Sequence, residues 1–227
     1  MIKAIATDVD GTLTNCKQIV DIEGILAIRE LESRGIRVSL CSGNALCVLK
    51  GLGGYIGCTG PYISENGGVV ERHGKMWILS QNRIAKDVVA ALKEEFGSKV
   101  REAWSNRYRF VDAAILRTVD IEDVREVAGR FPGIKVIDSG FAYHIIDKEV
   151  DKGKAVIKVA EILGIEPKEI AGVGDSTTDM ELLDVCGFKG VVENGDPKLK
   201  EKADFVAREP FGRGFAEIAK RILSQEA

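Results

Sequence analysis

The order of strand-like and helix-like segments at the start of the chain constrains the fold most. Residues 2–7 form a short apolar run typical of a buried strand, and residues 22–34 carry apolar side chains at helical spacing. Residues 36–41 repeat the strand pattern, and residues 42–49 are expected to form a second helix. This order predicts a parallel sheet, because parallel neighbours need a crossover connection between them.

The middle of the chain has a different pattern. Short strands are expected on either side of turns at Asn66-Gly67 and His73-Gly74. Beyond them, helix-like segments lie beside strand-like segments that turn directly into one another, which favours a small α+β unit. The segments of this unit are helices over residues 84–96 and 121–131 and strands over residues 109–116, 134–137 and 141–146.

Alternation of strands and helices resumes after residue 150. Helices are expected over residues 153–163 and 178–185, with a strand over residues 170–173 between them. The fold class is therefore α/β, a Rossmann-like doubly wound parallel sheet core with an inserted α+β cap domain. The expected domains are residues 1–81 and 152–227 for the core and residues 82–151 for the cap.

The composition excludes several classes of function. The 227 residues carry 32 Lys and Arg against 35 Asp and Glu, and 6% of them are aromatic. This near-neutral balance argues against nucleic acid as a partner, and the few aromatic side chains argue against stacking on single strands. No run approaches the roughly 18 apolar residues of a membrane span, so no membrane partner is expected. The five cysteines form no C-x-x-C pair and the N-terminus has no signal-peptide pattern, so we expect a cytoplasmic protein.

Acidic side chains follow two of the predicted parallel strands. Asp8 and Asp10 come after the first strand, and Asp175 and Asp179 follow the strand over residues 170–173. Ligands of open α/β sheets bind beyond the carboxyl ends of the strands, so these four acids should meet at one edge of the sheet. Like charges this close raise each other's pKa unless a cation binds between them.

The four acids suit a hard divalent cation, because carboxylate oxygens without Cys or His favour Mg²⁺. The sequence therefore predicts a magnesium site with Asp8, Asp10, Asp175 and Asp179 as candidate residues. Each acid taken alone could instead be a helix N-cap or a turn residue, as Asp often is after a strand.

Two further features suggest that an anion binds at the same edge. Ser42-Gly43-Asn44 offers a hydroxyl and backbone N–H groups at a predicted helix N-terminus, where anions bind readily. Lys152 stands at the start of another helix, where the helix dipole opposes a positive charge unless an anion lies in front of it. Without a ligand, Ser42 would be an ordinary N-cap and Lys152 a solvated charge beside Lys154.

These residues together resemble the motifs of the haloacid dehalogenase superfamily. Asp8-Val9-Asp10-Gly11-Thr12 is similar to the first motif, D-x-D-G-T. Ser42 and Lys152 resemble the second and third motifs, and residues 174–179 resemble the fourth. The four motifs occur in the family's order and anchor nearly the whole chain.

The insertion between the second and third motifs suggests one branch of this superfamily. The Cof-like branch of sugar and small-acid phosphatases has its larger cap there, and residues 62–68 resemble the segment after its second motif. The cap is short here, as in the archaeal phosphoglycolate phosphatases, which are the members that the chain most resembles. Asn44 and Thr178 depart from the family, since many relatives have Arg and Asn at these positions.

The resemblance implies a Mg²⁺-dependent phosphomonoester hydrolase. Asp8 would be the nucleophile that forms an aspartyl-phosphate, Asp10 the general acid and base, and Lys152 the bridge between Asp8 and the phosphate. The implied substrate is a small phosphorylated acid, 2-phosphoglycolate, which would give glycolate and phosphate. The implied binding residues are Ser42, Gly43 and Lys152 for the phosphoryl group, and Asp8, the Asp10 backbone carbonyl, Asp175 and Asp179 for Mg²⁺.

The cap is expected to close over the site about hinges at residues 80–82 and 148–150. Its candidate pocket residues are Tyr143, His144 and the Arg107/Arg109 pair. Because side chains alternate along a strand, at most one of Tyr143 and His144 points inward, and a satisfied histidine within a sheet is the simpler interpretation of His144.

Three alternatives stay open at this point. A sugar-phosphate phosphatase or a phosphomutase of the same superfamily would carry the same motifs, and a phosphomutase would retain the phosphoryl group. A non-catalytic, phosphate-binding regulatory relative should lack Asp8, Asp10 or Lys152, and all three are present. The sequence also leaves open whether the protein is a homodimer.

Overall fold

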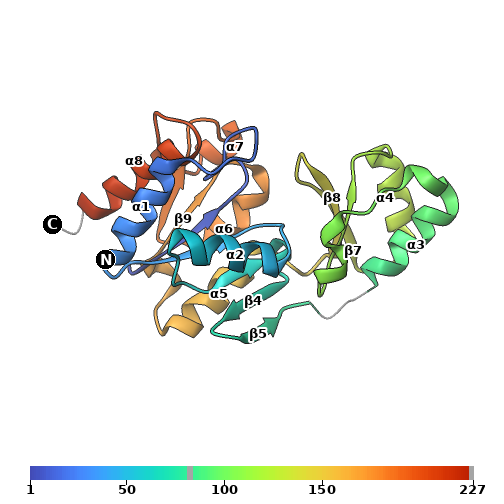
Figure 1. Ribbon diagram of the computed structural model, residues 1–227, viewed down its shortest axis with the longest axis horizontal. Helices are drawn as coiled ribbons and strands as arrows, with labels where there is room; N and C mark the ends of the chain where they lie inside the picture. The colour runs from blue at the N-terminus through green and yellow to red at the C-terminus, as the bar shows by residue number, and fades with distance from the viewer. Residues whose placement is uncertain (81–83, 225–227) are drawn as a thin grey trace.

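The computed structural model describes residues 1–80 and 84–224, which form two unequal lobes (Figure 1). Within these residues, the larger lobe is built on an eight-stranded sheet with the order β11-β10-β9-β1-β2-β3-β4-β5, and the smaller on a three-stranded sheet with the order β6-β8-β7. The α/β fold class predicted from the sequence is confirmed. The predicted hinge at residues 80–82 lies partly outside the described residues.

The large sheet is parallel except at one edge. β1 pairs in parallel with β2 on one side and with β9 on the other, whereas β3, β4 and β5 are joined by antiparallel pairing. The turn between β4 and β5 has His73 and Gly74 at positive φ, as expected for a tight hairpin. The strands are β1 (Ala4–Asp8), β2 (Arg37–Cys41), β3 (Tyr62–Ser64), β4 (Val69–Arg72), β5 (Lys75–Ile78), β9 (Ile170–Gly174), β10 (Phe188–Val191) and β11 (Phe205–Val206).

Helices cover both faces of the large sheet, as in a doubly wound fold. One hydrophobic cluster joins the sheet to helices that carry Ile28, Leu49 and Phe215, and another joins it to helices that carry Val156 and Leu182. The first group is α1 (Ile22–Ser33), α2 (Leu46–Ile56) and α8 (Phe211–Ser224), and the second is α5 (Lys152–Leu163), α6 (Met180–Val185) and α7 (Pro197–Lys200).

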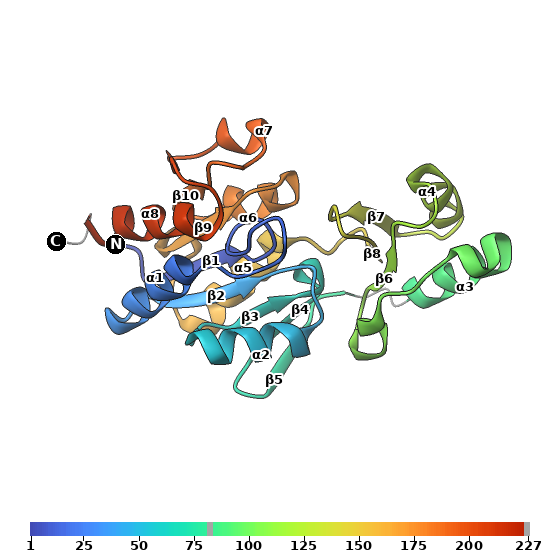
Figure 2. The same ribbon diagram turned by 45° about the horizontal axis from the view of Figure 1, so that its top comes forward.

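The small lobe places two helices on one face of its antiparallel sheet. Figures 1 and 2 show these helices on the side turned away from the large lobe. Tyr143 and Ile145 pack against the helices, whereas His144 points to the opposite face, toward the large lobe. The expected alternation is therefore confirmed. The elements are α3 (Ala85–Phe96), α4 (Ile121–Gly129), β6 (Ala113–Leu116), β7 (Ile134–Asp138) and β8 (Ala142–Asp147).

Two predicted elements are wrong in their bounds. The helix expected over residues 42–49 is α2, which begins only at Leu46, because the side chains of Ser42 and Asn44 turn toward Asp10 instead. The strand expected over residues 109–116 is limited to β6, because backbone N–H groups of residues 110–112 donate to a side chain of the large lobe.

No helix among the described residues is both long and apolar enough to cross a membrane.

Candidate active site

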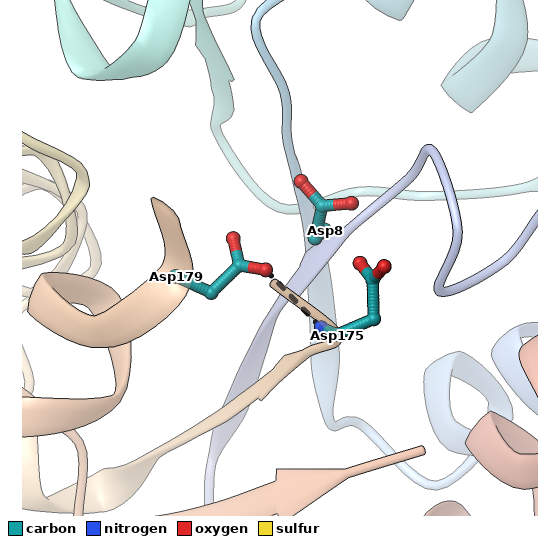
Figure 3. A group of neighbouring side chains, drawn as sticks. All are labelled: Asp8, Asp175 and Asp179. Atoms are coloured by element: carbon teal, nitrogen blue, oxygen red, sulfur yellow. Dashed lines mark hydrogen bonds between the residues drawn. The ribbon is translucent and has the colours of Figure 1, made fainter. Parts of the chain in front are cut away.

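Three carboxylates converge at the carboxyl ends of two adjacent strands (Figure 3). Asp8 is the last residue of β1, Asp175 follows β9, and Asp179 comes one turn later in the chain. Each offers an oxygen atom, and these oxygens all lie within 4.8 Å of one another. The parallel pairing of β1 with β9 therefore brings together residues that are far apart in the sequence.

Lys152 balances part of this negative charge. It is the first residue of α5, and its buried Nζ lies 2.7 Å from Asp8 Oδ1 and 2.6 Å from Asp179 Oδ1. Burial lowers the pKa of the ammonium group, but the charges of Asp179 and Asp8 outweigh it and hold the pKa well above its usual value. The carboxylates of Asp8 and Asp179 therefore supply the negative charge that was expected in front of this helix.

A tight loop brings Asp175 into place. The Thr12 hydroxyl donates to Asp175 Oδ1 at 3.0 Å, and Gly11 lies against the same carboxylate. Gly11 has a φ of +96°, and a Cβ atom there would stand 2.4 Å from Asp175 Oδ2. Only glycine fits both the backbone conformation and this close approach.

The cluster carries more negative charge than Lys152 can neutralise. Burial is the main cause that raises the pKa of Asp8 well above its usual range, with Lys152 acting against it. Burial and the nearby charge of Asp179 raise the pKa of Asp175 to about 7. A divalent cation would favour the ionised form of Asp8 and Asp175, and three hard oxygen donors suit such an ion. The residues present therefore fit a metal site made of Asp8, Asp175 and Asp179.

The Asp10 carboxylate lies outside this candidate metal group. Its Oδ2 accepts hydrogen bonds from Asn44 Nδ2 at 2.8 Å and from Ser42 Oγ at 3.2 Å. Burial raises the pKa of Asp10, and the hydrogen bonds from Ser42 and Asn44 act in the opposite direction. Asn44, one of the two departures from the family pattern, thus contacts an acid of the first motif. Thr178 is the other departure, and its hydroxyl is hydrogen-bonded to the Ser176 hydroxyl at 2.7 Å.

The loop after β2 presents backbone and hydroxyl groups to the same edge. The Asn44 N–H donates to Ser42 Oγ at 3.0 Å, so this N–H is used within the loop. The Gly43 N–H has no acceptor among the described residues. The predicted anion site therefore lies in a loop ahead of α2 rather than at a helix N-terminus.

A cavity of about 750 Å³ joins these groups, and both lobes line it. Of the residues predicted for catalysis, phosphate binding or metal binding, all but Asp179 line this cavity. Asp179 is fully buried behind them and accepts from the Asp175 and Ser176 N–H groups. The residues in question are Asp8, Asp10, Ser42, Gly43, Lys152 and Asp175. Of the candidate cap residues, His144 and Arg109 line it, whereas Tyr143 packs in the core of the small lobe and Arg107 lies outside the cavity lining.

The structure adds side chains that the predicted site does not include. Asn66, Arg109 and His144 line the cavity, the first from the large lobe and the other two from the small lobe. Arg109 and His144 were candidates from the cap, but Asn66 was predicted only as a turn residue. The signal that could have found Asn66 is that β3, parallel to β2, ends at Ser64 on the same edge of the sheet.

A buried carboxylate ties the two lobes together beside the cavity. Glu65 is fully buried, and its side chain accepts from the N–H groups of Phe110, Val111 and Asp112 at 2.8–3.1 Å. Arg109 Nη1 donates to the Gly43 carbonyl at 2.9 Å. The small lobe is thus hydrogen-bonded to the loop that follows β2.

Comparison with known families and proteins gives one consistent result. The model of the haloacid dehalogenase-like hydrolases matches residues 5–111 and 106–218. A phosphoglycolate phosphatase of Methanospirillum hungatei is 38% identical over 224 residues, covering 97% of this chain and 96% of that protein. A phosphoglycolate phosphatase of Methanoculleus marisnigri is 36% identical over 227 residues, with 97% of each chain covered.

A solved structure has the same fold over nearly its whole length. The crystal structure of a Thermoplasma acidophilum protein superposes with a TM-score of 0.89 at 30% sequence identity. The match covers 98% of this chain and 99% of that one, so the small lobe is included in the similarity.

Proposed function

This chain belongs to the haloacid dehalogenase-like hydrolases, and we propose that it hydrolyses the phosphomonoester of a small acid, 2-phosphoglycolate, to glycolate and phosphate. The observation that carries the proposal is the convergence of Asp8, Asp175 and Lys152 at the wall of one cavity, with Asp179 buried directly behind them. The relatives named phosphoglycolate phosphatase support the choice of substrate.

In the proposed first step, an Asp8 carboxylate oxygen attacks the phosphorus atom. The bond from phosphorus to the ester oxygen breaks, and Asp10 gives its proton to the departing glycolate oxygen. In the second step, Asp10 takes a proton from water, whose oxygen attacks the aspartyl-phosphate. Phosphate leaves, and the Asp8 carboxylate is restored.

Asp10 suits the role of proton donor for two reasons. Burial raises its pKa, which keeps a proton available closer to neutral pH. Its Oδ2 is fixed by Asn44 and Ser42, and the carboxyl group lines the cavity beside Asp8.

The phosphoryl group would be bound by the loop after β2 and by Lys152. The Gly43 N–H is available as a donor, and the Ser42 hydroxyl lies in the same loop. Lys152 already contacts Asp8, so its ammonium group can hold the nucleophile and a phosphoryl oxygen together. Phosphoryl transfer depends mainly on such positioning and charge stabilisation.

We propose Mg²⁺ as the metal ion of this enzyme. Asp8, the backbone carbonyl of Asp10, Asp175 and Asp179 would hold it. When bound, the ion supplies positive charge that neutralises the phosphoryl oxygens. The carboxylate donors and the raised pKa of Asp175 support this assignment.

We further propose that residues 82–151 act as the cap of a core made of residues 1–81 and 152–227. The small lobe contributes His144 and Arg109 to the cavity, which supports a role in selecting the substrate. The five cysteines are all unpaired, which suits the reducing cytoplasm as the proposed location. Homodimer formation stays a prediction.

The test is phosphate release from a panel of small phosphomonoesters in the presence of MgCl₂. We expect turnover of 2-phosphoglycolate that stops on addition of EDTA and is absent in Asp8→Asn with an unchanged circular dichroism spectrum. An active Asp8→Asn variant would refute the nucleophile assignment. Equal rates on all the esters would indicate a generalist, and conversion of a hexose phosphate to its isomer would indicate a phosphomutase.

A further inference from the structure

We propose that Asn66 and His144 form a subsite that binds the carboxylate of the substrate, beside the phosphoryl-binding loop. The inference rests on the proposed function, because it assigns side chains to the second anionic group of a small phosphorylated acid. One of the two comes from each lobe.

Asn66 carries a buried donor that the protein itself does not use. Its side chain lines the cavity and the residue is 6% exposed, and among the described residues its Nδ2 has no hydrogen-bond partner. The backbone N–H of Asn66 donates to the Ser42 carbonyl at 3.2 Å, which fixes the residue against the phosphoryl-binding loop. An orphaned buried amide is costly, and a ligand oxygen that reached it would offset that cost.

His144 is held by a chain of buried charged groups. Its Nδ1 lies 2.9 Å from Asp112 Oδ2, and Asp112 in turn accepts from Arg109 Nη1 at 2.7 Å. Burial raises the pKa of Asp112, but the hydrogen bond from His144 and the charge of Arg109 outweigh it and lower the pKa below its usual value. The ionised carboxylate accepts from the Nδ1–H and so orients the ring, and an Nε2–H on the cationic ring would then face a ligand.

The two side chains meet beside Gly43. A Cβ atom on Gly43 would stand 3.1 Å from Asn66 Nδ2 and 3.2 Å from His144 Cε1. In 2-phosphoglycolate only one methylene group separates the ester oxygen from the carboxylate. The carboxylate must therefore bind next to the phosphoryl group, and Gly43 is adjacent to Ser42 in the proposed phosphoryl-binding loop.

The other cations that line the described cavity are already paired with carboxylates of the protein. Lys152 contacts Asp8 and Asp179, and Arg109 contacts Asp112 and the Gly43 carbonyl. His144 shares Asp112 but offers its second ring nitrogen. A second substrate anion is therefore best matched by His144, with the amide of Asn66 beside it.

The test compares 2-phosphoglycolate with ethyl phosphate, which has the same ester but no carboxylate. The variants are His144→Gln, which keeps a neutral donor, and Asn66→Gly, which removes the amide and accepts the φ of 55° without strain. Each should lower the ratio of kcat/KM for the two substrates by about tenfold or more, mainly through KM for the acid, since a hydrogen bond to a charged group is lost. Cys16→Ser, an exposed residue that lines the same cavity, is the control and should leave the ratio unchanged.

Two different failures can be told apart. If the wild-type enzyme itself hydrolyses both esters equally well, the proposed substrate is wrong, and the carboxylate subsite with it. If the wild type prefers 2-phosphoglycolate and both variants keep that preference, the subsite alone is overturned. A fall in kcat for both esters without a change in their ratio would also overturn it, since it would show a structural or catalytic role.

Discussion

Lys152 is the residue on which the charge balance of the site depends. It is 4% exposed and lies between Asp8 and Asp179, so removing it leaves two buried carboxylates facing each other. The sequence predicted that an anion lies in front of this lysine, but only the structure shows which groups carry the negative charge. The protein supplies two such anions, and the phosphoryl group of the substrate would be the third.

We expect Lys152→Met to lower kcat by about 10²-fold or more, because one preorganised donor to the phosphoryl group is lost. Lys154→Met is the matched control, since Lys154 lies on the same helix turn with 54% of its side chain exposed. Steady-state phosphate release measures both, with circular dichroism to check the fold. A Lys152→Met enzyme with more than about a tenth of the wild-type rate would contradict the assignment.

Asn44 tunes the acid that we assign as proton donor. Its Nδ2 donates to Asp10 Oδ2, and this hydrogen bond lowers the pKa that burial raises. In Asn44→Ala the pKa of Asp10 should therefore rise further. The limb of the kcat/KM profile at which Asp10 loses its proton should move to higher pH, as a pH–rate series would reveal. A profile that does not move, or moves to lower pH, would separate Asn44 from proton transfer.

At the scale of elements, the junction between β3 and the segment before β6 holds the two lobes in register. The Glu65 carboxylate accepts N–H groups of residues 110–112, and Val111 packs against Val69 of β4. These contacts join the small lobe to the same loop region that carries Asn66. The orientation of the small lobe thus depends on a buried acid, together with the packing of Val111 and the hydrogen bond from Arg109 to the Gly43 carbonyl.

Glu65 should make the stability of the protein depend on pH. Burial, with the charge of Asp112, raises its pKa from 4.5 to about 7. The folded state therefore binds the proton more tightly than the unfolded state, and this contribution to stability is present at low pH and lost as the pH rises from about 4.5 to about 7.

Glu65→Gln removes this titration while it keeps the size of the side chain. The difference in the free energy of unfolding between wild type and Glu65→Gln should fall as the pH rises through that window, as measured by denaturant unfolding at pH 5 and pH 8. Glu122→Gln, an exposed acid of the small lobe, should show no such trend. The same difference at both pH values would argue against a raised pKa.

The elements that sequence patterns predicted best are the buried parallel strands, because each is a continuous run of residues that are buried on both faces of the sheet. The strands that end at Asp8 and Gly174 are clear apolar runs, so the meeting of Asp8 with Asp175 could be predicted from parallel pairing alone. The start of α2 could not be predicted in this way. Ser42-Gly43-Asn44 resembles a helix cap, but the side chains of Ser42 and Asn44 donate hydrogen bonds to Asp10. The contact between Glu65 and residues 110–112 could not be predicted from the sequence pattern, because the donors are backbone N–H groups, which almost every residue has.

At the scale of the whole molecule, the acids at the sheet edge lower stability until a cation binds. Burial and then the charge of Asp179 raise the pKa of Asp175 to about 7, and a bound divalent ion would favour its ionised form. Metal that binds only the folded state stabilises it, by about 2.7 kcal/mol at a hundred times the dissociation constant. The near-neutral composition of the chain therefore conceals a local excess of negative charge.

Thermal unfolding with and without MgCl₂ tests this balance. We expect Mg²⁺ to raise the Tm of the wild type, and Asp175→Asn to raise the Tm without Mg²⁺ while it weakens the response to the ion. Asp138→Asn is the control, because Asp138 lines the same cavity from the small lobe and pairs with Arg117. A metal-induced shift of wild-type size in Asp175→Asn would exclude that residue from the metal site.

The position of β1 in the sheet has a consequence for how the protein is made. β1 precedes both of its partners in the chain, so it can pair with β2 soon after synthesis, but its other neighbour begins at Ile170, which pairs with Ala4. At 5–20 residues per second, that partner arrives on the order of ten seconds later. Until then one edge of β1 has unpaired backbone groups that can pair with other strands, and Asp175 is not yet in place beside Asp8. The proposed metal site is therefore incomplete until the chain has been synthesised as far as Asp179.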